Sequence, residues 1–94
     1  MSVTYTAMAI FGVYFNSVEE AEQLLAEHGL DYESDSIEAD MIGLEAMNAY
    51  TGDTVVLGIE MQLGDTFEKY QLLWDEKLPG IGLTPQGILE VKTG

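Results

Sequence analysis

Carboxylates dominate the side chains that could do chemistry in this sequence, and one run of them has the spacing of a calcium-binding loop. Asp31, Glu33 and Asp35 occupy alternate positions, as do the first three ligands of a twelve-residue calcium loop. Such a loop requires glycine at its sixth position and a bidentate glutamate at its twelfth, and here those positions hold Ser36 and Ile42. The sequence therefore predicts no dedicated metal site.

Few residues could serve as a nucleophile, a base or a phosphate-binding loop. His28 is the only histidine and falls at the end of an apolar helix face, where a helix C-terminus favours a cation. Glu60 is the only acid inside a strongly apolar stretch, and the alternation there predicts that its side chain points to solvent. Gly80-Ile81-Gly82 is too short for a phosphate-binding fingerprint and has no adjacent Lys or Arg. We therefore expect a protein that is not an enzyme, with no catalytic residues and no cofactor.

The charge balance is strongly acidic. The 94 residues contain 17 Asp and Glu against three Lys and no Arg, and residues 1–68 contain neither Lys nor Arg. Such a surface repels nucleic acid and anionic lipid and attracts basic proteins. The chain has no cysteine, which fits a reducing compartment, and no apolar run approaches the roughly 20 residues that span a bilayer. We expect a cytoplasmic protein that contacts neither nucleic acid nor membrane directly and whose partner is a basic protein surface, such as that of a nucleic-acid-binding protein.

The acids are densest between residues 19 and 45. On an extended chain, Asp31, Glu33 and Asp35 would project to one side about 6.6 Å apart, which is twice the rise of a strand and close to the phosphate repeat of a nucleic-acid strand. A rigid array of this kind could occupy the basic channel of a nucleic-acid enzyme. The predicted partner-binding residues are Glu19, Glu20, Glu22, Glu27, Asp31, Glu33, Asp35, Glu38 and Asp40.

In size and charge, though in no motif, the chain resembles the small acidic phage proteins that inhibit restriction and CRISPR enzymes. This resemblance implies a non-enzymatic inhibitor that acts by nucleic-acid mimicry. The alternative is a generic small oligomeric interaction domain whose acidity serves solubility or salt adaptation. Halophilic proteins usually retain arginine, so its absence here argues against salt adaptation.

Two helices are predicted from their capping signals. Ser17 is the N-cap of the first, with Glu20 at the capping-box position, and Gly29 provides a left-handed stop. Asp65 is the expected N-cap of the second, with Glu68 three residues later.

Alternating apolar residues predict strands over 3–11, 55–63 and 88–91. A fourth strand is expected over 41–50, joined to the next by a turn at 51–53, although residues 37–48 also have a helical spacing. The order β-α-β-β-α-β predicts a single α+β domain over residues 1–94. This would be a ferredoxin-like sandwich with a four-stranded antiparallel sheet and two helices on one face.

The opposite sheet face would then be uncovered and partly apolar. Met8, Ile10 and Val56 fall on that face. An uncovered apolar face commonly marks an interface, so these three residues are the predicted contacts of a homodimer or of a protein partner.

Overall fold

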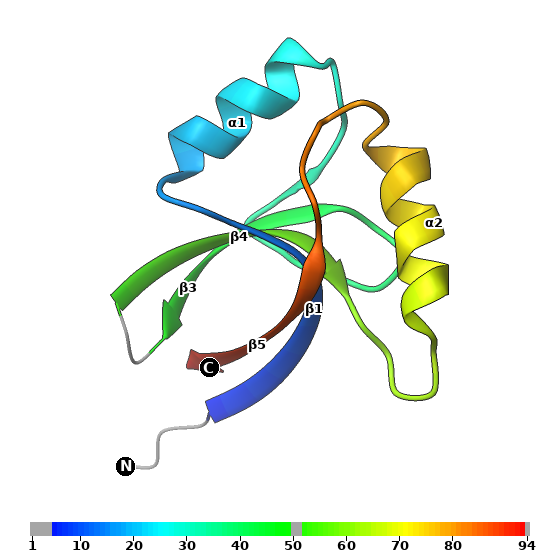
Figure 1. The fold of residues 1–94 in the computed structure, drawn as a ribbon. Helices are drawn as coiled ribbons and strands as arrows, with labels where there is room; N and C mark the ends of the chain where they lie inside the picture. Colours follow the sequence, from blue (N-terminus) through cyan, green and yellow to red (C-terminus); the bar gives the residue numbers. More distant parts are fainter. Residues whose placement is uncertain (1–4, 50–51, 94) are drawn as a thin grey trace.

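The computed structural model describes residues 5–49 and 52–93, and these form two helices and one sheet (Figure 1). In chain order the elements are β1 (Tyr5–Phe15), α1 (Val18–Glu27), β2 (Glu33–Ser34), β3 (Gly43–Ala49), β4 (Gly52–Glu60), α2 (Phe67–Lys77) and β5 (Gln86–Thr93). The protein is therefore a small α+β structure with a five-stranded sheet. Within the described residues, neither helix is long and apolar enough to cross a membrane.

The sheet is mixed, whereas the sequence predicted a purely antiparallel one. Its strand order is β2-β3-β4-β1-β5, and the four longer strands pair antiparallel with their neighbours. β2 adds a fifth strand parallel to β3, where the Glu33 N–H donates to the Ile42 carbonyl and the Asp35 N–H to the Leu44 carbonyl. The prediction of four strands is wrong because a two-residue strand is too short to show an alternating pattern.

The stretch with two competing patterns, residues 37–48, contains a strand and no helix: it is a loop up to residue 42 and strand β3 from Gly43. β3 pairs with β4 from Gly43 opposite Gly58 to Ala49 opposite Gly52, as a hairpin requires. The predicted turn residue Thr51 lies outside the described residues, as does Val3 at the start of the predicted first strand.

The N-cap of each helix is a side-chain hydroxyl. The first cap is the residue that the sequence predicted, and the second is its neighbour. The Ser17 hydroxyl accepts from the Glu20 N–H at 3.1 Å, which confirms the first cap, and Gly29 ends that helix region with φ +62°. The second helix is capped by Thr66, not Asp65: the Thr66 hydroxyl accepts from the Lys69 N–H at 3.3 Å. Both residue types cap well, so the sequence alone did not decide between neighbours.

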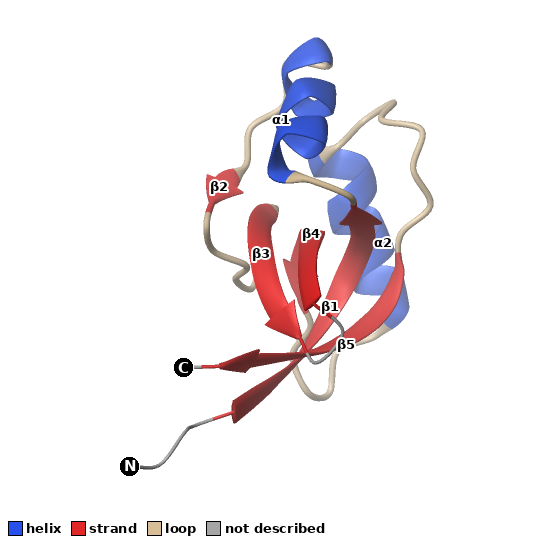
Figure 2. Ribbon diagram, turned by 90° about the vertical axis from the view of Figure 1, so that its left-hand side faces the viewer, coloured by secondary structure: helices blue, strands red, loops and turns tan. Residues whose placement is uncertain are grey.

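The two helices pack on the same face of the sheet (Figure 2). Leu25 from α1 and Trp74 from α2 share one core with Phe11 and Leu57 of the central strands. The rings of Phe11 and Trp74 meet edge to face with centroids 6.3 Å apart, a favourable aromatic geometry. This core anchors α1, and thereby sets which α1 side chains face outward.

The opposite face of the sheet is closed by the curvature of the sheet itself. β1 and β4 are strongly bent, and β3 contacts β5 although two strands separate them in the sheet (Figure 1). Tyr14 and Glu90 illustrate the bend. Glu90 of β5 is paired with Met8 of β1, which precedes Tyr14 by six residues. On a straight strand Met8 and Tyr14 would be about 20 Å apart. Nevertheless, the Tyr14 hydroxyl donates to Glu90 Oε1 at 2.5 Å. The helix-free face is therefore the concave inside of a coiled sheet.

A row of three glycines permits this bend. Gly12, Gly58 and Gly43 are paired across β1, β4 and β3, on the concave side. A Cβ at Gly12 would overlap the Leu57 carbonyl oxygen, and one at Gly43 would overlap the Ser36 carbonyl oxygen. Glycine within a strand commonly marks such a close approach of backbones.

The Gly12→Ala variant is expected to lose about 3 kcal/mol of unfolding free energy, because its new Cβ meets backbone that cannot rotate away. Urea denaturation measures the loss. Gly87→Ala is the matched control in the next strand: its Cβ would lie 3.2 Å from the end of the Phe67 ring, which can shift. A loss at Gly12 no larger than that at Gly87 would show that the sheet is not bent at the glycine row.

Candidate functional site

The predicted partner-binding residues are all exposed, and together they are here called the acidic face. They come from α1, from the segment leading into β2, from β2 itself and from the loop after it. Figure 2 shows α1 at the top of the molecule, with β2 and the start of that loop at its left. The members of the acidic face are Glu19, Glu20, Glu22, Glu27, Asp31, Glu33, Asp35, Glu38 and Asp40.

The helical part of the acidic face follows from helix periodicity. Ala21 and Leu25 are fully buried against the sheet, so the intervening acids must face solvent. Glu19 and Glu20 lie in the first turn, where the helix dipole stabilises negative charge. The capped helix therefore displays its carboxylates from a fixed backbone.

The alternating run after α1 is only partly as predicted. Tyr32 donates its hydroxyl to Glu22 Oε2 at 3.0 Å, which ties this segment to α1. Asp31 and Glu33 then line one pocket together. Asp35 has a left-handed backbone with φ +58° and does not line that pocket. The expected three-carboxylate ladder therefore does not continue to Asp35, because the chain turns there to cross the sheet.

The loop after β2 is anchored although its acids are exposed. Ile37 is buried in the concave core, and the Glu38 carbonyl accepts from the Glu60 N–H at 3.0 Å. The Glu38 carboxylate accepts from the Ser36 hydroxyl at 3.1 Å. These contacts hold the loop and its carboxylates against the sheet.

Lysine neutralises little of this surface. Lys69 lies 3.0 Å from Asp65 and 3.7 Å from Asp40, and these are the ion pairs among the described side chains. Hydrogen bonds from Tyr70 and Lys69 lower the pKa of Asp65, and the bond to Asp65 raises the pKa of Lys69. Asp40 is thus the one member of the acidic face with a lysine partner in the described part of the chain.

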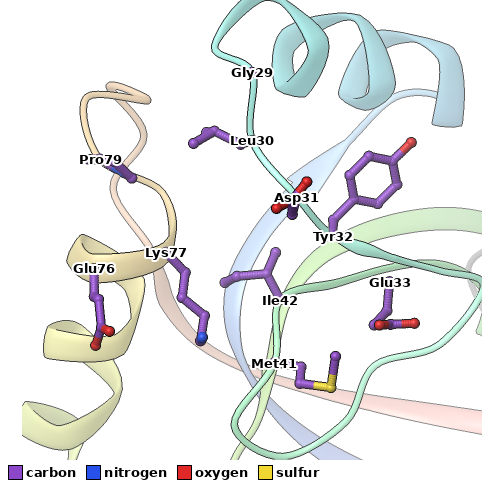
Figure 3. Close-up of a pocket in the computed structure, with 10 residues that line it drawn as sticks. All are labelled: Gly29, Leu30, Asp31, Tyr32, Glu33, Met41, Ile42, Glu76, Lys77 and Pro79. Carbon is purple, nitrogen blue, oxygen red and sulfur yellow. The ribbon is translucent and has the colours of Figure 1, made fainter.

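A pocket of about 440 Å³ opens beside the acidic face (Figure 3). It lies between the segment after α1, the start of β3 and the end of α2. Its lining residues are Gly29, Leu30, Asp31, Tyr32, Glu33, Met41, Ile42, Glu76, Lys77 and Pro79. Sequence reasoning missed it, because no local pattern indicates that residues 29–33 and 76–79 meet.

The predicted dimer face is largely inside the molecule. Ile10 and Val56 are 0% exposed and pack with Ile37 and Ile88, and Met8 packs against this cluster from its edge. The expectation that this face is uncovered is wrong for Ile10 and Val56. The coiled sheet and the loop through Ile37 cover them within one chain.

Three other residues, His28, Glu60 and Glu45, lie outside the acidic face. His28 is the C-cap residue of α1 and its Nδ1 lies 3.0 Å from the Leu24 carbonyl, which confirms its interpretation as a helix-terminal residue. Glu60 is partly exposed at the end of β4. Glu45, within the dense acidic stretch, is only 6% exposed and lies opposite Val56, so it is not part of the acidic face. Among the described residues, no three His, Asp or Glu side chains are grouped closely enough to hold a metal ion.

The Tyr14–Glu90 pair makes a pH-dependent contribution to stability. Burial, the hydrogen bond to Glu90 and the charge of Glu90 raise the pKa of Tyr14 from 10.0 to about 12. A raised pKa in the folded state means that this stabilisation is complete below pH 10.0 and is lost as the pH rises to about 12. The difference in alkaline tyrosine absorbance between wild type and Tyr14→Phe isolates this group. Glu90→Gln should return its pKa toward 10.0, and a wild-type value near 10.0 would contradict the contact across the bend.

Comparison of the chain with protein-family models, with curated proteins and with solved structures finds no match. The functional inference therefore depends on the geometry and charge of the acidic face.

Proposed function

We propose that the protein is a non-enzymatic binding protein whose acidic face engages the basic surface of another protein. The observation that carries this proposal is the combination of exposure and anchoring. Nine carboxylates between residues 19 and 40 are exposed, and Asp40 alone among them has a lysine partner in the described part of the chain. Electrostatic complementarity of this kind steers association and sets specificity.

The partner class that fits best is a nucleic-acid-binding protein. Its binding channel is basic, and fixed carboxylates could occupy the positions of phosphates there. The proposed role is then phage-type inhibition of a nucleic-acid-acting enzyme, of the anti-restriction or anti-CRISPR kind, by mimicry. We place such a protein in the cytoplasm, where its targets act, and regard its α+β fold as a ferredoxin-like sandwich with one added edge strand.

The test starts from basic proteins captured from a host lysate at low salt, each then purified. The affinity of each purified basic protein for the acidic protein should fall at least tenfold between about 50 and 200 mM salt, because salt screens the charges that hold the two together. Duplex DNA should displace the acidic protein competitively. An affinity that does not change with salt, together with no displacement by duplex DNA, would overturn the proposal. If no basic protein is retained and stability rises strongly in molar salt, the acidity serves salt adaptation instead.

A further inference from the structure

The pocket beside the acidic face combines apolar walls with a carboxylate rim. Leu30 and Ile42 supply apolar wall, and Asp31 and Glu33 supply carboxylates from one segment. Glu76 supplies a further carboxylate from α2, on the other side of Lys77 (Figure 3). Met41 and Pro79 complete the apolar lining, and Met41 is 39% exposed. The site therefore favours a ligand that is both partly apolar and cationic.

We propose that this pocket receives one arginine side chain of the basic partner. This inference rests on the proposed function and names the contact that anchors it. An arginine has an apolar stem that suits the Leu30 and Ile42 wall and a planar head with five donors that suits several carboxylates at once. The volume of about 440 Å³ falls in the usual range for sites that enclose small ligands, so it also admits the adjoining backbone.

The separation of the carboxylates distinguishes an arginine from a metal ion. A calcium ion needs oxygen ligands converging at about 2.3–2.6 Å, and no group of three acids in the described residues is arranged in that way. The extended, forked donor set of a guanidinium can bond carboxylates that do not converge on one point. We therefore expect a polyatomic cation rather than a metal ion in this pocket.

Lys77 occupies the same pocket and opposes a cationic ligand. Its side chain extends from the last turn of α2 into the space between α2 and Ile42 (Figure 3). No ion pair holds it there among the described residues. The incoming arginine must displace the Lys77 ammonium, so removing that charge should strengthen binding. A generic acidic surface would show no such specific dependence on Lys77.

The experiment is a ¹⁵N–¹H NMR titration with arginine capped at both termini as the probe. Capped citrulline is the control, because it has the same shape but no charge. Saturable shifts are expected for the amides of residues 29–33, 41–42 and 76–77 with arginine and not with citrulline. Shifts spread evenly over all acidic segments, or equal shifts from citrulline, would overturn the proposal.

Variants sharpen the assignment. Asp31→Asn with Glu33→Gln should weaken arginine binding roughly fourfold or more, at roughly two- to fivefold for each exposed charged contact. Glu19→Gln with Glu27→Gln removes the same charge from α1, outside the pocket, and should change it less than twofold. Lys77→Met should strengthen binding roughly threefold, from the same range for an exposed charge. Equal weakening by the two double variants, or no gain from Lys77→Met, would refute the pocket.

The two proposals fail separately. If capped arginine does not bind the pocket while purified basic proteins still bind with strong salt dependence, the arginine anchor is wrong and the acidic face stands. If neither binds, the proposed function fails. The spectra themselves show whether each variant remains folded.

Discussion

The Ile10→Lys variant is expected to lose about 4 kcal/mol or more of its free energy of unfolding. Ile10 is 0% exposed and lies inside the coiled sheet with Val56, Ile88 and Ile37. A lysine there must either bury an ammonium without a designed partner or force the sheet open, and both are costly. Since small domains are stable by only about 5–15 kcal/mol, this loss removes a large share of the protein's total stability. Chemical denaturation followed by circular dichroism measures the change.

Leu89→Lys is the matched control. Leu89 is on the adjacent strand β5 but is 75% exposed, so a lysine there keeps its hydration. Its expected effect is within about 0.5 kcal/mol, as for other surface substitutions. If Ile10→Lys instead stays folded and converts a dimer into monomers in sedimentation, then the concave face is an interface between chains. The single-chain burial of Ile10 would then be wrong.

The largest effect on binding is expected from reversing the charge of three members of the acidic face that lie in and beside β2. The triple variant Asp31→Lys, Glu33→Lys and Asp35→Lys should weaken the Kd for a purified basic partner about a hundredfold at low salt. Each reversal replaces an attraction with a repulsion, worth about 1 kcal/mol per exposed pair, and three of them give about 3 kcal/mol. Isothermal titration at about 50 mM salt measures the change, and the difference should shrink as salt screens the charges.

A control for net charge is needed because any reversal makes the protein less acidic. Glu68→Lys with Asp75→Lys changes two acids of α2 that are exposed and lie outside both the acidic face and the pocket. This pair is compared with Asp31→Lys and Glu33→Lys, which change the net charge equally. Equal losses from the two pairs would mean that bulk charge, and not the acidic face, governs binding. Unchanged binding in the triple variant would refute the acidic face as the site.

The coiled sheet bears directly on where a partner can bind. Because β3 and β5 approach each other, the helix-free face encloses a second small core, formed by Ile10, Ile37, Val56 and Ile88 among the described side chains. The helical face is occupied by α1 and α2. The acidic face and its adjoining pocket are exposed, and we therefore propose them as the place of the protein contact.

Several features were predictable because their physics is local. The first helix was placed by Ser17, Glu20 and Gly29, since capping involves residues only a few positions apart. The long strand β4 was visible from strict alternation. The exposure of the nine acids also followed, because ionised carboxylates stay in water unless they are paired.

Other features depended on contacts between distant parts of the chain. β2 is defined by its pairing with β3 and has no pattern of its own. The Tyr14–Glu90 hydrogen bond joins residues 76 positions apart, and Lys77 reaches the pocket formed with Asp31 only because α2 ends beside that segment. The second helix cap was wrong by one residue, since Asp65 instead accepts from Tyr70 and Lys69 within the folded structure.

By itself, the sequence determined an acidic, cysteine-free chain with two capped helices and alternating strands, because composition, caps and periodicity are properties of the chain alone. The tertiary structure decided which apolar residues remain accessible. Glycines at positions 12, 43 and 58 leave the inside of the bend without side chains, and the sheet therefore closes over Ile10 and Val56. That closure turned a predicted interface into core, and the binding surface that we propose therefore consists of the carboxylates and their pocket.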